Sequence, residues 1–178
     1  MSTSPNQEPF GVPELLQKLV SRLLGTAVAI LRDEEELAPI AFVVSTSTSA
    51  VEAVLLNQSG EKDKQESLAG IRQHCLRPEV DGVLVFTEGW GLSSDMGAHV
   101  EEIRQRFGSI ADSPYRVDTF LAILETPDQR WMALSELQPH PSAAGRVFKE
   151  ALVFVYQGQP GQLDFGMFSD FFLYRRTH

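Results

Sequence analysis

The spacing of apolar residues predicts a long amphipathic helix near the start of the chain. From Val12 to Ile30, apolar side chains recur at steps of three or four residues, which is the period of one helix face. Pro13 is a favoured first-turn residue, and Glu14 offsets the positive end of the helix dipole, so the helix should begin here. The acidic run 33–36 should end it, because carboxylates are repelled at the negative end.

Shorter apolar runs predict β-strands. These runs cover residues 40–44, 51–56, 83–88, 117–125, 130–137 and 148–157. The first two are rich in β-branched residues and are joined by hydroxyl residues, which indicates a hairpin. A second hairpin is expected around Thr126-Pro127-Asp128-Gln129, because this proline favours a type I turn. The glycine-dense stretch 89–97 is expected to be an irregular crossing.

Two further helices complete the predicted elements. Leu68, Ile71 and Cys75 share one face of a helix that should end before Pro78. A short helix is expected over 100–107.

The order of these elements predicts an α+β fold. Strands mostly follow strands, which favours a largely antiparallel sheet of about five to six strands, with the N-terminal helix and one or two further helices packed on one face. The domain organisation is expected to be a flexible lead-in over 1–11, a single α+β domain over 12–157 and an aromatic C-terminal tail over 158–178. Gly158 to Gly161 would be the hinge of that tail.

Composition limits the classes of partner. The 178 residues include 15 Lys and Arg against 24 Asp and Glu, a net charge of −9, which disfavours nucleic acid and an anionic membrane as partners. No apolar run is long enough to span a bilayer, and no secretory signal is visible at the N-terminus. A single cysteine excludes an internal disulfide. We therefore expect a cytoplasmic protein.

The common catalytic and cofactor motifs are absent from the sequence. The four histidines, at 74, 99, 140 and 178, lack metal-ligand spacing, so neither a metal nor a cofactor is expected. His74 and Cys75 are adjacent and would point about 100° apart on a helix, which favours Cys75 as a buried core thiol. The hydroxyl run 45–49 lacks the glycines and lysine of a phosphate-binding loop and is expected to stabilise a turn.

A pocket near Trp90 is the candidate ligand site. Glutamates recur in the predicted strands at positions 52, 88, 125, 136 and 150. If neighbouring strands brought Glu88 and Glu125 together, repulsion would raise a pKa and supply a general acid. The flanking glycines let Trp90 cap the core or line a cleft, and Trp131 is the only other tryptophan. Core or hairpin packing of both rings is the favoured interpretation, and a ring that faces a ligand is the alternative.

Two stretches resemble known sequences. Val83–Trp90 and Lys149–Val155 are similar to small bacterial proteins of uncharacterised families, in which a strand ending in Glu-x-Trp precedes one opening with Glu-Ala-Leu. The resemblance covers 15 residues and implies a bacterial or phage origin, without an activity or catalytic residues.

The C-terminal tail carries the aromatic residues Phe165, Phe168, Phe171, Phe172 and Tyr174. So much aromatic surface has to be covered, either by docking on the chain itself or by a second subunit or partner. The primary hypothesis is a non-enzymatic protein that acts through protein contacts as a homo-oligomer. The first alternative is a small-molecule or metal-dependent enzyme with its site around Trp90, and the second is a module that binds a small ligand without chemistry.

Overall fold

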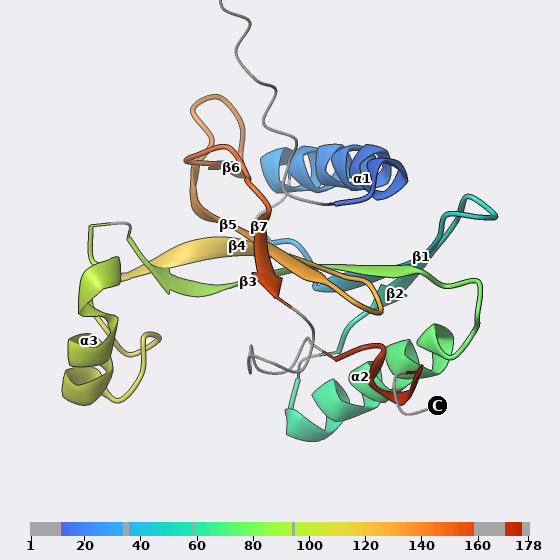
Figure 1. Cartoon of the computed structure of the whole chain (residues 1–178). Coiled ribbons are helices and arrows are strands. Elements are labelled where there is room, and N and C mark those ends of the chain that lie inside the picture. Colours follow the sequence, from blue (N-terminus) through green and yellow to red (C-terminus); the bar gives the residue numbers. More distant parts are fainter. Residues whose placement is uncertain (1–11, 34–35, 58, 94, 159–169, 176–178) are drawn as a thin grey trace, which may run out of the picture.

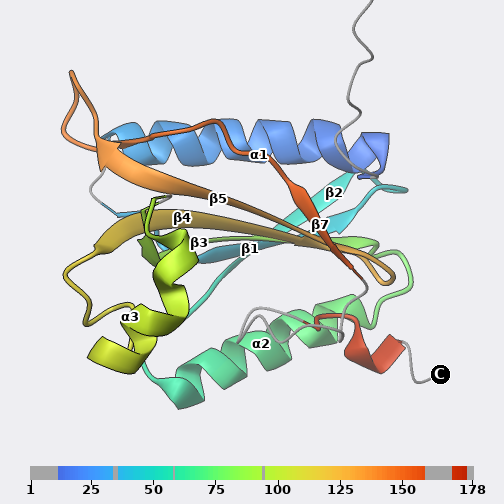
Figure 2. The same cartoon turned by 60° about the vertical axis from the view of Figure 1, so that its left-hand side comes forward.

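The helices and the sheet form three layers. The computed structural model describes residues 12–33, 36–57, 59–93, 95–158 and 170–175. Helix α1 (Glu14–Asp33) covers one face of the sheet and helix α2 (Glu61–Cys75) covers the other (Figures 1 and 2). The α+β class is confirmed, whereas the helices are divided between two faces instead of gathered on one. The reason lies in the central strand, where residues 82–87 are all buried, so both faces need a cover.

The sheet is antiparallel throughout, with the order β2-β1-β3-β4-β5-β6, and β7 also pairs with β5. Its strands are β1 (Ile40–Ser45), β2 (Ala50–Leu55), β3 (Gly82–Leu92), β4 (Arg116–Glu125), β5 (Arg130–Pro139), β6 (Arg146–Phe148) and β7 (Val155–Gly158). Both predicted hairpins are present. They are β1–β2, closed by the hydroxyl run, and β4–β5, closed at Pro127.

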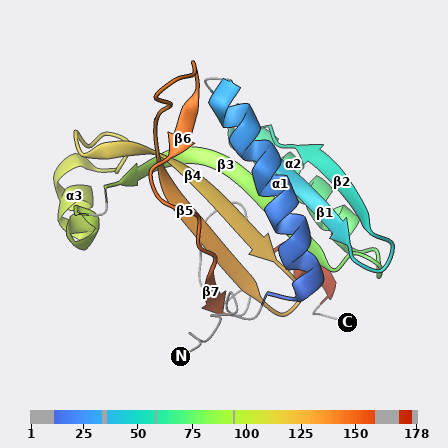
Figure 3. The same ribbon diagram turned by 90° about the horizontal axis from the view of Figure 1, so that it is seen from above.

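One core lies between α1 and the sheet. The helix buries Leu16, Val20, Ala27 and Leu31, at the predicted spacing, against sheet residues that include Leu84, Phe86, Phe120 and Trp131. Each large side chain buried in this way stabilises the fold by about 1.5–3 kcal/mol. The helix crosses the sheet obliquely and leaves the β1–β2 hairpin on one side and β5 on the other (Figure 3).

A second core lies on the opposite face. Leu68, Ile71 and Cys75 of α2 pack against the sheet, as their shared helix face predicted. Phe171 and Phe172 of the C-terminal segment fill the same core and are at most 1% exposed. Phe171 and Phe172 therefore dock on the chain's own domain.

The strand β3 is longer than the sequence predicts. Gly89, Trp90 and Gly91 continue the strand and pair with Thr119, Asp118 and Val117 of β4, where an irregular crossing was expected. A Cβ on Gly91 would lie 2.5 Å from Thr119 Oγ1. Close approach between strands thus explains Gly91, which sequence alone does not distinguish from a loop glycine, whereas a Cβ on Gly89 would meet open space.

The prediction of one strand over residues 148–157 was wrong. The strands β6 and β7 pair with opposite ends of β5, and residues 149–154 between them form no ladder. The Ser135 hydroxyl is 3.0 Å from the Glu150 carbonyl oxygen, to which it donates, and it accepts the Glu150 N–H. The Ser135 side chain of β5 thus bonds the Glu150 backbone groups, which in a continuous strand would pair with the backbone of β5. The Glu-Ala-Leu stretch is therefore not the start of a strand.

The connection between β3 and β4 contains the 3₁₀ turn η1 (Gly97–His99) and helix α3 (Val100–Phe107), as predicted over 100–107. A second 3₁₀ turn, η2 (Leu173–Arg175), lies at the C-terminal end of the described residues. Among the helices described, none combines the length and the apolar composition that a membrane crossing requires.

The loop between β5 and β6 is fixed to the end of α1 at Gly145. The Gly145 N–H donates to the Arg32 carbonyl oxygen over 3.0 Å, and a Cβ at this position would run into the carbonyl oxygens of Leu31 and Arg32. Backbone atoms cannot rotate aside as a flexible side chain can. The close approach therefore requires glycine.

We expect Gly145→Ala to lower the free energy of unfolding by about 1–3 kcal/mol, because the added methyl overpacks this contact. Gly25→Ala is the matched control, since Gly25 lies within α1 with open space around its Cβ position. It should stabilise the protein by about 0.5–1 kcal/mol through helix propensity. Urea unfolding measures both changes, and equal effects of the two substitutions would contradict the prediction.

Candidate functional site

The four residues of the predicted pocket lie in three separate places. Glu88 and Trp90 are in the second half of β3, where they contribute to a cavity of about 420 Å³ with Glu36, Asp118 and others. Glu125 pairs in register with Val83 near the start of that strand and contacts the α2-side core, whereas Trp131 pairs with Leu124 and faces the α1-side core. The sheet thus separates the two glutamates along the strand.

Glu88 is held by structural contacts. Its carboxylate accepts the Leu37 N–H at 2.7 Å and pairs with the Arg146 guanidinium at 2.7 Å. Trp90 beside it is 57% exposed, and the Arg116 guanidinium lies 5.1 Å from the centre of its ring, a cation–π contact. The cavity therefore contains the Glu88–Arg146 ion pair and the Trp90 ring, and Arg116 of the same chain already contacts that ring.

Glu125 forms a buried charge cluster that fastens the C-terminal segment. It is fully buried with Arg130, whose Nη2 lies 2.8 Å from the Glu125 carboxylate. The same carboxylate accepts the backbone N–H groups of Asp170 and Phe171, at 3.0 and 2.8 Å. Arg130 also pairs with the Asp170 carboxylate at 3.1 Å. We call these contacts the Glu125 latch.

Trp131 belongs to the α1-side core. Its ring is fully buried and meets Tyr156 of β7 edge to face, with the ring centres 6.1 Å apart. Core packing, the favoured interpretation of both tryptophans, therefore describes Trp131 and not Trp90.

Glu52 and Glu136, two of the other predicted strand glutamates, form ion pairs within the chain. On β2, Glu52 binds Arg77 at 2.8 Å and lies 3.3 Å from His74, and Arg77 is the main reason that the pKa of Glu52 is lowered. On β5, Glu136 binds Lys149 at 2.7 Å. Among the described residues, no three His, Cys, Asp or Glu side chains gather in a way that could hold a metal ion.

Cys75 is buried, as predicted. Burial raises the pKa of its thiol to about 12, and the nearby Glu125 charge adds to the shift. The neighbouring His74 contacts Glu52 instead, so the two adjacent residues do not form a nucleophile and base.

The predicted interaction tail is resolved in part. Phe171 and Phe172 are buried in the α2-side core, while Tyr174 is 52% exposed. Phe165, Phe168 and the proposed hinge beyond Gly158 lie outside the described residues. Phe171 and Phe172, the core residues of this tail, thus contact their own chain.

The strand β2 is an open edge of the sheet. The Leu56 N–H donates to the Pro39 carbonyl at 2.9 Å. The alternation of an antiparallel ladder then turns the backbone N–H and C=O groups of Val51, Ala53 and Leu55 away from β1. The side chains of these three residues stand on the α1 face of the sheet, opposite Val44, Phe42 and Ile40, and Leu55 is 71% exposed.

This edge lacks the features that usually protect an exposed strand. It contains neither lysine nor proline, and its pairing with β1 has no bulge over six residues. Its one charged residue, Glu52, lies on the α2 face and is paired with Arg77. By contrast, the β5 edge is divided between the short strands β6 and β7.

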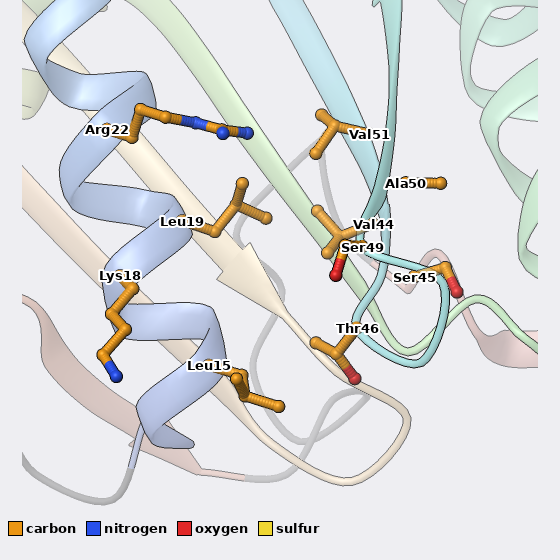
Figure 4. Close-up of a pocket in the computed structure, with 10 residues that line it drawn as sticks. All are labelled: Leu15, Lys18, Leu19, Arg22, Val44, Ser45, Thr46, Ser49, Ala50 and Val51. Atoms are coloured by element: carbon orange, nitrogen blue, oxygen red, sulfur yellow. The ribbon is translucent and has the colours of Figure 1, made fainter.

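A groove runs between α1 and the β1–β2 hairpin (Figure 4). Its volume is about 320 Å³, and we call it the α1–β2 groove. It is lined by Leu15, Lys18, Leu19, Arg22, Val44, Ser45, Thr46, Ser49, Ala50 and Val51. Leu19 and Arg22 reach from the helix toward Val44 and Val51 on the sheet.

Neither the open edge nor the groove was predicted from the sequence. Two sequence features could have indicated these surfaces. Leu15 is an apolar residue beside the helix stripe, and apolar residues alternate along β2. Strand order decides that β2 is an edge, however, and strand order was not available from the sequence.

We expect Glu125→Gln to lower the free energy of unfolding by about 3–5 kcal/mol, because it removes the buried carboxylate charge that faces Arg130 and leaves that cation paired with the more exposed Asp170 carboxylate. Loss of the latch should also speed the reaction of Cys75 with a thiol reagent. Glu136→Gln, which removes a partly exposed ion pair, is the control and should change stability by about 0–1 kcal/mol. Urea unfolding and thiol labelling of the native protein measure both effects, and equal behaviour of the two variants would show that the latch is not needed.

No protein-family model, no curated protein and no solved structure matches this chain.

Proposed function

We propose that this chain is a non-enzymatic protein that acts through protein contacts and pairs with a second copy of itself along β2. The observation that carries the proposal is the open, unprotected edge of β2, with its outward backbone groups and its exposed apolar row. A long, flat, apolar edge is a ready template for another strand, and monomeric proteins usually block it.

The residues of β2 suit pairing with their own copy. Two antiparallel β2 strands related by a twofold axis at Ala53 would place the small Ala53 side chains opposite each other. Val51 of one copy would then lie opposite Leu55 of the other on the α1 face. An interface of this kind is self-complementary, because the same residues contribute from both sides. Each outward N–H and C=O would gain a partner.

Charge does not oppose this pairing, although the chain carries a net charge of −9. The α1-face row Val51, Ala53 and Leu55 is uncharged, and Glu52 is already paired with Arg77 within its own chain. In this register Glu52 would face Val54 of the second copy, so two carboxylates do not meet. Like charges placed directly opposite would have been destabilising.

The same geometry favours β2 over the other contacts considered. Phe171 and Phe172 are buried in the chain's own core, so they offer no surface to a partner. The enzyme hypothesis needed Glu88 and Glu125 together, but Glu125 of β4 lies opposite Val83, five residues along β3 from Glu88. Edge pairing therefore replaces the aromatic tail as the proposed contact.

We expect the wild-type protein to reach twice the 19.8 kDa mass of one chain as its concentration rises, and Ala53→Lys to remain monomeric. The substitution places two ammonium groups opposite each other at the axis and, because Ala53 is exposed, leaves the fold intact. Sedimentation and light scattering measure the mass, and circular dichroism checks the fold.

Leu134→Lys is the matched control, because Leu134 is 54% exposed on β5 and lies away from the β2 edge. This variant should dimerise like the wild type. Ala53→Pro provides a second test, since the Ala53 N–H points outward and its removal spares the β1 ladder. A wild-type monomer at every concentration, or equal masses for Ala53→Lys and Leu134→Lys, would overturn the proposal.

A further inference from the structure

We propose that the α1–β2 groove binds a small amphipathic carboxylate, a molecule with a short acyl chain and one anionic head group. This inference does not depend on pairing along β2. Four observations support it: the volume of the groove, its apolar walls, the charge of its rim and the contacts of its hydroxyl groups.

The groove has the size and walls of a site for a short acyl chain. Its volume of about 320 Å³ is at the lower end of the range for small-ligand pockets, roughly 300–1,000 Å³. Leu15 and Leu19 form the helix wall, and Val44 and Val51 form the sheet wall (Figure 4). Leu15 is 62% exposed, so an acyl chain lying against it would remove apolar surface from water.

The rim of the groove is cationic in a chain that is strongly acidic. Lys18 and Arg22 line it from α1, and none of its lining residues is acidic, although the chain has 24 acidic residues against 15 basic ones. A carboxylate is therefore the head group that the rim complements.

The two cations differ in how far they are already engaged. Lys18 pairs with Glu14 at 2.8 Å, and this hydrogen bond raises the pKa of Lys18, so it stays charged. The Arg22 guanidinium has no hydrogen bond or ion pair among the described residues and extends over the groove toward Val51 (Figure 4). Arg22 is thus the cation available to a ligand.

Four hydroxyl groups of the hairpin, those of Ser45, Thr46, Ser47 and Thr48, are engaged in hydrogen bonds with nearby side chains. Thr46 donates its N–H and its hydroxyl to Asp81, and Ser45 exchanges hydrogen bonds with Ser47 and Thr48. The Asp81 carboxylate is turned to these donors and does not line the groove. Recognition of the head group therefore falls to Arg22, while the apolar walls select the chain.

Octanoate is the probe, because it combines a carboxylate with an eight-carbon chain. We expect it to shift the amide NMR signals of residues 15–22 and 44–51 saturably in the full-length protein. Acetate has the head group without the chain, and octylammonium has a chain of the same length with the opposite charge. Both should bind at least about tenfold more weakly than octanoate.

Substitutions test each part of the site. Arg22→Gln should weaken octanoate binding about tenfold, and Leu15→Ser should also weaken it. Both residues are exposed, so the fold is retained. Arg104→Gln removes an exposed cation of α3 and should change nothing. Binding should persist in Ala53→Lys, which separates this site from the β2 contact.

Three results would overturn the proposal. The first is octanoate shifts that do not saturate. The second is equal binding of octylammonium, which would indicate an apolar crevice without selection for charge. The third is an Arg22→Gln variant that binds octanoate as well as Arg104→Gln does.

Discussion

The two-sided burial of the central strands is the constraint on which the rest of this structure depends. Residues 82–87 of β3 are buried on both faces, as is most of β4 from Thr119 onward. A sheet of this kind needs one layer on each side, because apolar surface left in water weakens the fold. Helix α1 supplies the first layer. Helix α2 supplies the second together with Phe171 and Phe172, so the C-terminal segment is part of the core.

The Glu125 latch follows from this constraint, because the C-terminal segment has to be held on the sheet. A buried carboxylate is tolerated where a cation and backbone amides satisfy it, and Glu125 has Arg130 together with the amides of Asp170 and Phe171. The glutamate that was a candidate for chemistry therefore has a structural role in fastening the tail.

The same constraint leaves two surfaces uncovered. Because α1 crosses the sheet obliquely, it protects β3 and β4 and leaves the β1–β2 hairpin beside it. The outward backbone of β2 and the α1–β2 groove are both on this side of the molecule, and Val51 belongs to each. The backbone edge suits a strand, whereas the groove suits a small apolar molecule with an anionic head. The proposed contact surface and the proposed ligand surface are therefore neighbours, with different chemistry.

The sequence by itself determined the elements that depend on local periodicity and turn chemistry. These include α1, the two hairpins with the Pro127 turn, the buried face of α2 and the α+β class. Tertiary structure decided what depends on long-range contacts. Strand order made β2 an edge, and the register of β3 with β4 placed Glu125 opposite Val83, five residues from Glu88. Pairing with β4 kept Gly91 within a strand, and the Ser135 hydroxyl interrupted the run 148–157. Periodicity records which side of an element is apolar, but it carries no information about the neighbour that covers it.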